Sequence, residues 1–179
     1  MTAWVLDDRP FGDLAALVAG SAVAWPGELL HLVAEVAHGV RYDRSGRRAA
    51  LLALTSKEGS ACVRVHDLEV GSPADDVLMY LRAGGVAGMP TKDVGEDASI
   101  ALCAAQLVDG VFVTHDKRAA FIALAELGRG RVTTPFDLWD DLQARALIAQ
   151  STFDRLCEAT LKGDHSLPGI PRRIRRPRP

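Results

Sequence analysis

Short apolar runs that end at a polar residue alternate along this chain with longer segments of helical periodicity. Residues 3–6 form one such run, which ends at Asp7, and residues 111–114 form another, which is followed closely by Asp116. Runs of this length are typical of buried strands, and strands that alternate with helices form a mostly parallel sheet with helices on both faces. The sequence therefore predicts an α/β fold, a three-layer α/β/α sandwich around a mostly parallel central sheet.

Turn and capping signals divide the rest of the chain into further elements. Ser72-Pro73-Ala74-Asp75 is a helix start, because a hydroxyl N-cap precedes a proline at the first helical position and an acid at the third. Similar starts at Thr134 and Ser151 predict two final helices. Further strands are predicted at 21–25, 61–70 and 131–133, and the other helices at 12–19, 29–38, 95–107 and 117–127.

The composition fits one soluble domain with an appended tail. The 179 residues are 48% apolar and 25% charged, a balance that supports a substantial core and excludes disorder of the whole chain. The predicted domain covers residues 1–166, and residues 167–179 are predicted to be a disordered, flexible tail rich in proline and arginine. Because no apolar run is long enough for a membrane span and no signal peptide is evident, we expect a cytoplasmic protein without membrane contact.

The tail differs in charge from the rest of the chain. It carries five arginines and no acidic residue, and since the whole chain has a formal charge of −2, the body has a charge of about −7. Such a segment can contact RNA phosphates, with an affinity that depends on salt, or it can lie against the acidic body. The candidate nucleic-acid-binding residues in the tail are Arg172, Arg173, Arg175 and Arg176.

Three aspartates are the candidates for chemistry. Asp7 and Asp116 follow the ends of two predicted strands, and the carboxyl ends of parallel strands meet at one edge of a sheet. Asp97 opens a predicted helix on its apolar, sheet-facing side. Carboxylates at one edge repel one another unless a cation such as Mg²⁺ or Mn²⁺ lies between them, and such a site can hydrolyse phosphodiesters. The alternatives are that Asp7 is a turn residue and that Asp97 only complements the helix dipole.

Two strings of residues resemble a known family. Asp97-Ala98-Ser99-Ile100-Ala101-Leu102-Cys103-Ala104 and Val111-Phe112-Val113-Thr114-His115-Asp116 look like the second half of a PIN domain, in which an acid opens a helix and an apolar strand ends in Thr-x-Asp. The resemblance spans roughly residues 3–160 and implies a single α/β/α domain with a parallel sheet. It also implies a Mg²⁺- or Mn²⁺-dependent ribonuclease that acts on RNA, in a family that includes toxins neutralised by an antitoxin.

Carried over by position, the resemblance implies a set of site residues. The implied catalytic residues are Asp7, Asp97, Asp116 and Thr114. The three aspartates would bind the metal ion, with Thr114 near the scissile phosphate or orienting an acid. Glu35 matches the position of a fourth metal-binding acid.

The chain departs from the family's pattern at two points. Asp8 follows Asp7 where a small residue is usual, so either aspartate is a candidate for the first ligand. Lys117 stands near the position where many members have another acid. These departures support a second hypothesis, an inactive PIN-like module that binds RNA or a protein without cleavage.

Several other side chains have interpretations that need no metal. Asp93 and Glu96 have the spacing of a capping box, so Glu96 is predicted to belong to the helix start and is the weaker candidate for a metal ligand. His31, Glu35 and His38 fall on one face of the predicted helix 29–38, where a solvated polar face is the commoner case. Three apolar residues of a late helix fit either the core or the interface of a homodimer, namely Leu138, Trp139 and Leu142.

Overall fold

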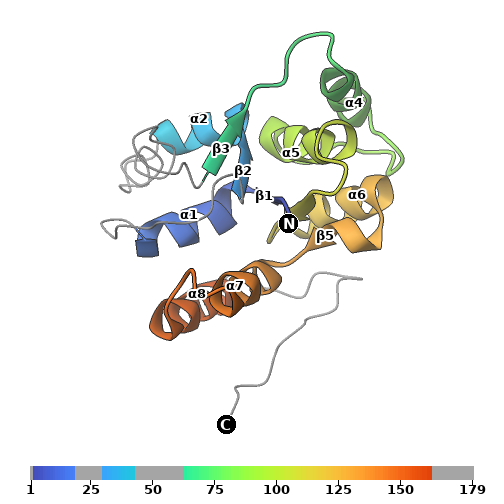
Figure 1. Cartoon of the computed structure of the whole chain (residues 1–179). Helices are drawn as coiled ribbons and strands as arrows, with labels where there is room; N and C mark the ends of the chain where they lie inside the picture. The colour runs from blue at the N-terminus through green and yellow to red at the C-terminus, as the bar shows by residue number, and fades with distance from the viewer. Residues whose placement is uncertain (1, 19–29, 43–62, 163–179) are drawn as a thin grey trace.

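The computed structural model describes residues 2–18, 30–42 and 63–162 (Figure 1). The strand predicted at 21–25 therefore lies outside the described residues. The tail also lies outside them, with its candidate RNA-binding residues Arg172, Arg173, Arg175 and Arg176.

Among the described residues, five short strands form one parallel sheet. They are β1 (Trp4–Leu6), β2 (Leu30–Val33), β3 (Val63–His66), β4 (Val111–Val113) and β5 (Val132–Thr133). Their order across the sheet is β3-β2-β1-β4-β5, and every pair of neighbours is parallel. Trp4 pairs with Leu30 on one side and with Val111 on the other, so the first strand of the sequence is the central strand of the sheet. The predicted α/β fold with a parallel sheet is confirmed.

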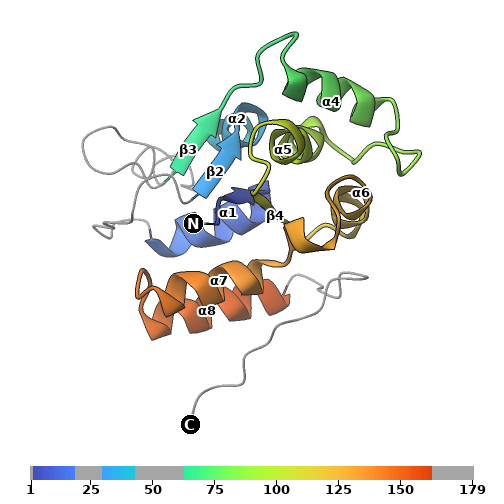
Figure 2. The same cartoon turned by 45° about the vertical axis from the view of Figure 1, so that its right-hand side comes forward.

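Helices cover both faces of this sheet (Figures 1 and 2). They are α1 (Asp8–Val18), α2 (Ala34–Tyr42), α4 (Pro73–Arg82), α5 (Val94–Ala105), α6 (Lys117–Leu127), α7 (Pro135–Ala144) and α8 (Gln150–Lys162). Helix α5 lies against β1, β2 and β4, with α4 and α6 packed beside it, whereas α1, α7 and α8 lie together on the other side. Helix α2 contacts both α1 and α5. The layers are consistent with the predicted sandwich.

The prediction of a helix over 29–38 is wrong at its start. Leu30–Val33 is strand β2, buried along its whole length, and helix α2 begins only after it. A strand that is buried on both faces of a parallel sheet forms a continuous apolar run, which periodicity alone does not distinguish from a helix. His31 therefore belongs to the sheet and does not share a helix face with Glu35 and His38.

The capping signals locate helix starts better than periodicity does. The Ser72 hydroxyl accepts a hydrogen bond from the backbone N–H of Asp75 (3.2 Å) and begins α4 where predicted. Helix α1 begins at Asp8, earlier than the predicted range of 12–19. Pro10 falls within its first turn, where the missing N–H of proline has no intrahelical partner to lose.

The late helices close the core on the side of α1. Leu138, Trp139 and Leu142 are fully buried, so they are core residues of this chain. The indole N–H of Trp139 donates to the hydroxyl of Thr160 (2.9 Å), which joins α7 to α8. No helix in the described part of the chain has the length and apolar character needed to cross a bilayer.

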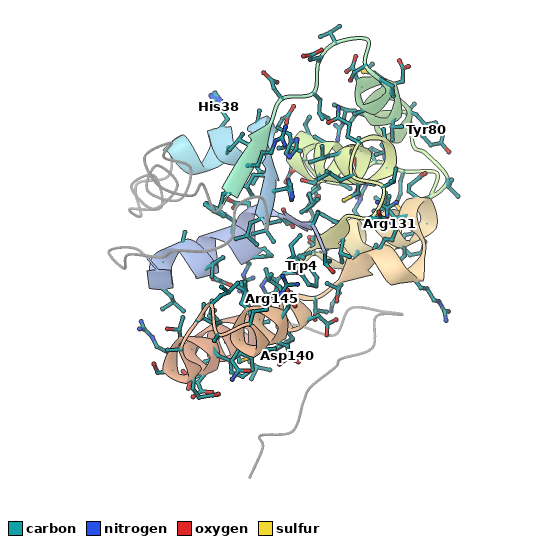
Figure 3. The ribbon with its side chains drawn as sticks, in the orientation of Figure 1. Trp4, His38, Tyr80, Arg131, Asp140 and Arg145 are labelled. Atoms are coloured by element: carbon teal, nitrogen blue, oxygen red, sulfur yellow. The ribbon has the colours of Figure 1, made fainter. Side chains whose placement is uncertain are left out.

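Arg131 ties the end of α5 to the strands that follow it (Figure 3). Its guanidinium donates to three backbone carbonyls, those of Cys103 (2.6 Å), Leu107 (2.8 Å) and Gly110 (3.2 Å). The last carbonyls of a helix have no partner within it, so a cation that binds them stabilises the end of the helix. Arg131→Ala should lower the free energy of unfolding by about 2–4 kcal/mol, measured by urea titration.

Arg129 provides the control for this prediction. It lies in the same short 3₁₀ turn as Arg131 and is exposed. Arg129→Ala should change the free energy of unfolding by less than about 0.5 kcal/mol. Equal effects of the two substitutions would show that the three carbonyl contacts do not matter for stability.

Candidate functional site

Asp7 and Thr114 directly follow the neighbouring strands β1 and β4, and the sheet brings them together. The backbone N–H of Asp7 donates to the carbonyl of Val113 (3.1 Å), which extends the strand pairing by one residue. The Thr114 hydroxyl donates to Asp7 Oδ2 (2.6 Å) and accepts from the backbone N–H of Asp116 (3.0 Å). One hydroxyl therefore holds two of the predicted aspartates in place.

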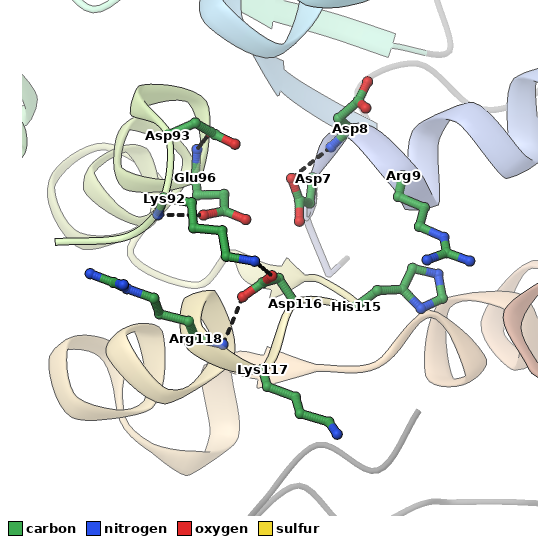
Figure 4. A pocket seen from close by; sticks show the side chains of 10 residues that line it. All are labelled: Asp7, Asp8, Arg9, Lys92, Asp93, Glu96, His115, Asp116, Lys117 and Arg118. Atoms are coloured by element: carbon green, nitrogen blue, oxygen red, sulfur yellow. Dashed lines mark hydrogen bonds and ion pairs between the residues drawn. The ribbon is translucent and has the colours of Figure 1, made fainter. Parts of the chain in front are cut away.

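The ends of these strands open onto a pocket of about 500 Å³ (Figure 4). Its lining comes from the ends of β1 and β4 and from the starts of α1, α5 and α6. The lining residues are Asp7, Asp8, Arg9, Lys92, Asp93, Glu96, His115, Asp116, Lys117 and Arg118. Both acidic and basic side chains line the pocket. Its place beyond the carboxyl ends of the strands is where open α/β sheets bind ligands.

Asp7 and Asp8 both line the pocket but differ in exposure. Asp7 is 8% exposed, whereas Asp8 is an exposed residue of the first turn of α1. The backbone N–H of Asp8 donates to Asp7 Oδ1 (2.8 Å), so both carboxylate oxygens of Asp7 accept a hydrogen bond. Of the two aspartates that the sequence left as alternatives, Asp7 is the buried and oriented one.

The start of α5 brings a further carboxylate, that of Glu96, to the pocket. Asp93 is the N-cap and accepts from the backbone N–H of Glu96 (3.0 Å), which confirms half of the predicted capping box. The Glu96 carboxylate accepts from the backbone N–H of Lys92 (3.2 Å), and the side chain is only 5% exposed. A Cβ atom at Gly95 would meet Val36 of α2 at 3.0 Å, so glycine allows the close packing that holds this helix start in place.

Burial raises the pKa of two acids of the pocket. The loss of hydration raises the pKa of Asp7 from 3.8 to about 6, although its two hydrogen bonds act in the opposite direction. Burial, together with the charges of Asp7, Asp93 and Asp116, raises the pKa of Glu96 from 4.5 to about 8. Glu96 is therefore mostly protonated near neutral pH, and a cation in the pocket would favour the ionised form of both acids.

Asp116 has two functions at the start of α6. Its Oδ1 accepts from the backbone N–H groups of Arg118 (2.7 Å) and Ala119 (3.0 Å), and so it caps the helix. Its Oδ2 lies 3.6 Å from the ammonium nitrogen of Lys92 (Figure 4). The cap therefore uses one oxygen and leaves the other directed at the pocket.

Asp97 lies outside this pocket. Its fully buried carboxylate accepts from the guanidinium of Arg82 in α4 (2.8 Å) and from the backbone N–H of Thr91 (3.1 Å). Successive residues of a helix point about 100° apart, so Glu96 faces the pocket while Asp97 faces α4. The structure therefore does not bring Asp97 together with the acids at the ends of the strands.

Glu35 lies in the first turn of α2, just beyond the end of β2, and is not among the residues that line the pocket. Its Oε2 is buried and has no hydrogen bond to the described residues. His38 is exposed on the outside of α2 (Figure 3). His31 is buried in β2, where its Nδ1 lies 2.8 Å from Nε2 of His66 in β3. The three residues predicted to share one face thus have three different surroundings.

The pocket has donor atoms that suit a hard divalent cation. Asp7, Glu96 and Asp116 present carboxylates from three different elements. Mg²⁺ and Mn²⁺ take such oxygens together with water molecules. In residues 2–18, 30–42 and 63–162, no three side chains of the metal-binding kinds are already gathered around one point. A cation would therefore draw the carboxylates closer together.

Glu96 and Lys92 are two of the pocket residues that lie outside the set of site residues predicted from the sequence. The spacing of Glu96 from Asp93 indicates a helix cap, and the structure contains this cap. The capping pattern gives no sign that the Glu96 carboxylate also lines a pocket. Lys92 lies in a short polar stretch before the helix, where a lysine has no pattern to distinguish it. On the sequence alone, Glu96 is therefore only a weaker candidate for a metal ligand than Asp97.

No model of a known protein family matches this chain, and no curated protein and no solved structure matches it either. The chemistry of the pocket must therefore be inferred from its own residues.

Proposed function

We propose that this protein is a divalent-metal-dependent ribonuclease that hydrolyses RNA phosphodiester bonds in the pocket beyond β1 and β4. The proposal depends on one observation, the pocket beyond the carboxyl ends of β1 and β4 that Asp7, Glu96 and Asp116 line together from three different elements. Several acids that line one pocket, with basic side chains beside them, suit a cation and a phosphate better than they suit a neutral ligand. The resemblance of the sequence to PIN domains supports the same function.

The donors of the pocket fit Mg²⁺ or Mn²⁺. Asp7, Glu96 and Asp116 would hold the ion, and Glu35 is the candidate for a fourth acid because it has a buried oxygen without a hydrogen bond to the described residues. A bound cation would offset the burial and the mutual repulsion that raise the pKa of Asp7 and Glu96. Such an ion supplies activation of water and stabilisation of charge on a phosphodiester.

The chain's own residues orient the acids and offer contacts to the substrate. The Thr114 hydroxyl holds the carboxylate of Asp7 and the amide of Asp116, so the two aspartates keep a fixed separation. Arg9 and Lys117 line the same pocket and carry the charge that RNA phosphates require. The acidic side chains would bind the metal ion and the basic side chains would bind the phosphate. The pocket therefore suits a phosphodiester as well as a metal ion.

The test compares two neighbouring acids. Wild-type protein should cleave a labelled pool of single-stranded RNA with Mn²⁺ or Mg²⁺, and chelation of the metal should abolish cleavage. Glu96→Gln should lower the rate at least about 10²-fold and weaken Mn²⁺ binding measured by calorimetry, because it removes a carboxylate of the pocket. Asp97→Asn should keep both properties within a few-fold, because the carboxylate of Asp97 is bound to Arg82.

The same pair of variants separates function from folding. Asp97→Asn should lower the free energy of unfolding by on the order of 2 kcal/mol, because it breaks a pair with a fully buried member. Loss of cleavage in folded Asp97→Asn protein, with Glu96→Gln active, would assign the site to the acid expected from the family resemblance. A folded wild type that neither cleaves RNA nor binds Mn²⁺ would refute the nuclease and favour the binding module.

A further inference from the structure

The segment before α5 is held in place from two sides. The guanidinium of Arg118 in α6 donates to the carbonyl of Pro90 through Nε (2.9 Å) and Nη2 (2.6 Å). The backbone N–H of Thr91 donates to buried Asp97, and the Thr91 hydroxyl donates to the carbonyl of Asp93 (2.7 Å). Residues 90–93 are therefore tied to both helices that border the pocket, and the position of the residue between them is fixed.

That residue is Lys92, and both its backbone N–H and its ammonium group contact acids of the pocket. Its backbone N–H donates to the carboxylate of Glu96 (3.2 Å), and its ammonium lies 3.6 Å from Asp116 Oδ2 (Figure 4). The side chain is 69% exposed, so solvent and a polymer that enters the pocket can reach the ammonium.

We propose that Lys92 is a catalytic residue whose ammonium binds the scissile phosphate, an inference that rests on the nuclease function. Fixed cations that contact a reacting phosphoryl group stabilise the charge that develops on its oxygens. Asp116 holds the ammonium at the pocket before the substrate arrives, which lowers the cost of ordering a long side chain. Lys92 thus brings an ammonium group to the site beside the acids that would hold the metal ion.

The reaction that Lys92 would assist is hydrolysis of the phosphodiester. The oxygen of a water molecule bonds to phosphorus, and the bond between phosphorus and the leaving ribose oxygen breaks. One proton of the water passes from the attacking oxygen to the solvent, and the leaving oxygen takes up a proton from the solvent to become a hydroxyl. The ammonium contacts a non-bridging phosphate oxygen throughout and is unchanged at the end.

The experiment uses a short single-stranded RNA with saturating Mn²⁺ and compares the wild type with Lys92→Ala and Lys92→Arg. Lys92→Ala should lower kcat about 10²-fold with KM within about threefold, because the contact strengthens in the transition state. Lys92→Arg should retain more activity, and added ethylammonium should restore part of the rate of Lys92→Ala. Lys162→Ala, at the exposed end of α8, should match the wild type.

Each alternative role predicts a different result. Calorimetry with Mn²⁺ alone should show that Lys92→Ala binds the ion at least as tightly as the wild type, since the ammonium no longer competes at Asp116. A raised KM with unchanged kcat would make Lys92 a simple RNA contact, and a raised kcat would make it an inhibitory counter-ion. Unchanged cleavage by Lys92→Ala would overturn this inference alone, whereas an inactive wild type would overturn the nuclease function as well.

Discussion

Asp7→Asn is expected to lower the rate of RNA cleavage by at least about 10³-fold. Asp7 is buried at the end of the central strand, and both of its carboxylate oxygens are oriented toward fixed hydrogen-bond donors. Asparagine has nearly the same shape but lacks the negative charge that would hold a divalent cation. The rate should be measured under single-turnover conditions with labelled RNA and saturating Mn²⁺, and circular dichroism should confirm that the variant is folded.

Asp8 supplies the matched control for this prediction. Its side chain is exposed and lines the same pocket one residue later in the chain. Asp8→Asn should reduce the rate by less than about tenfold, because an exposed charge is screened by solvent. A larger loss at Asp8 than at Asp7 would make Asp8 the first metal-binding residue. Full activity in both variants would exclude a metal site at the end of β1.

The metal-free protein is expected to lose stability as the pH rises from about 5 to 9. The pKa of Glu96 is raised from 4.5 to about 8, and that of Asp7 from 3.8 to about 6. At a pH between the ordinary and the raised pKa of each acid, the folded chain binds more protons than the unfolded chain. The free energy of unfolding therefore falls with rising pH. The stabilisation is complete below about pH 4 and is lost as the pH passes 6 and then 8. Chemical denaturation with chelator present should show a loss on the order of 5 kcal/mol.

Two comparisons test the origin of this loss. Glu96→Gln should be more stable than the wild type near pH 8 and should show a flatter dependence on pH, because its amide does not ionise. Glu158→Gln, on the exposed face of α8, should follow the wild-type curve. Mn²⁺ at 100 times its dissociation constant should raise the free energy of unfolding by about 2.7 kcal/mol near pH 8. An identical pH dependence in Glu96→Gln would show that the pocket acids do not cause the loss.

The sequence located one half of the candidate site. Strand ends are visible in a sequence, because an apolar run stops at a polar residue, and parallel strands end at the same edge. That reasoning placed Asp7 and Asp116 together, whereas Thr114, whose hydrogen bonds join the two aspartates, was implied only by the resemblance to PIN domains. The placement of the two aspartates at one edge depended only on local sequence pattern and on the rule that alternating strands and helices form a parallel sheet.

The other half depends on packing between elements that are distant in the sequence. Whether Glu96 or Asp97 faces the pocket is decided by the rotation of α5, and Arg82 of α4 fixes that rotation through its ion pair with Asp97. Periodicity within α5 places Asp97 on the apolar side of the helix. It does not reveal that Arg82 of α4 pairs with this aspartate. The error at Leu30–Val33 has a related cause, since only the neighbouring strands make this apolar run extended.

The central place of β1 also determines when the pocket can exist. The bond between Thr114 and Asp7 joins residues 107 positions apart, so a ribosome that adds 5–20 residues per second needs roughly 5–20 s between them. During that interval β1 has no β4 beside it, and the acids of α5 and α6 have not all been made. Contacts of such long range form late and slowly in folding. The pocket, and with it the proposed activity, can therefore form only after Asp116 and the start of α6 have been synthesised.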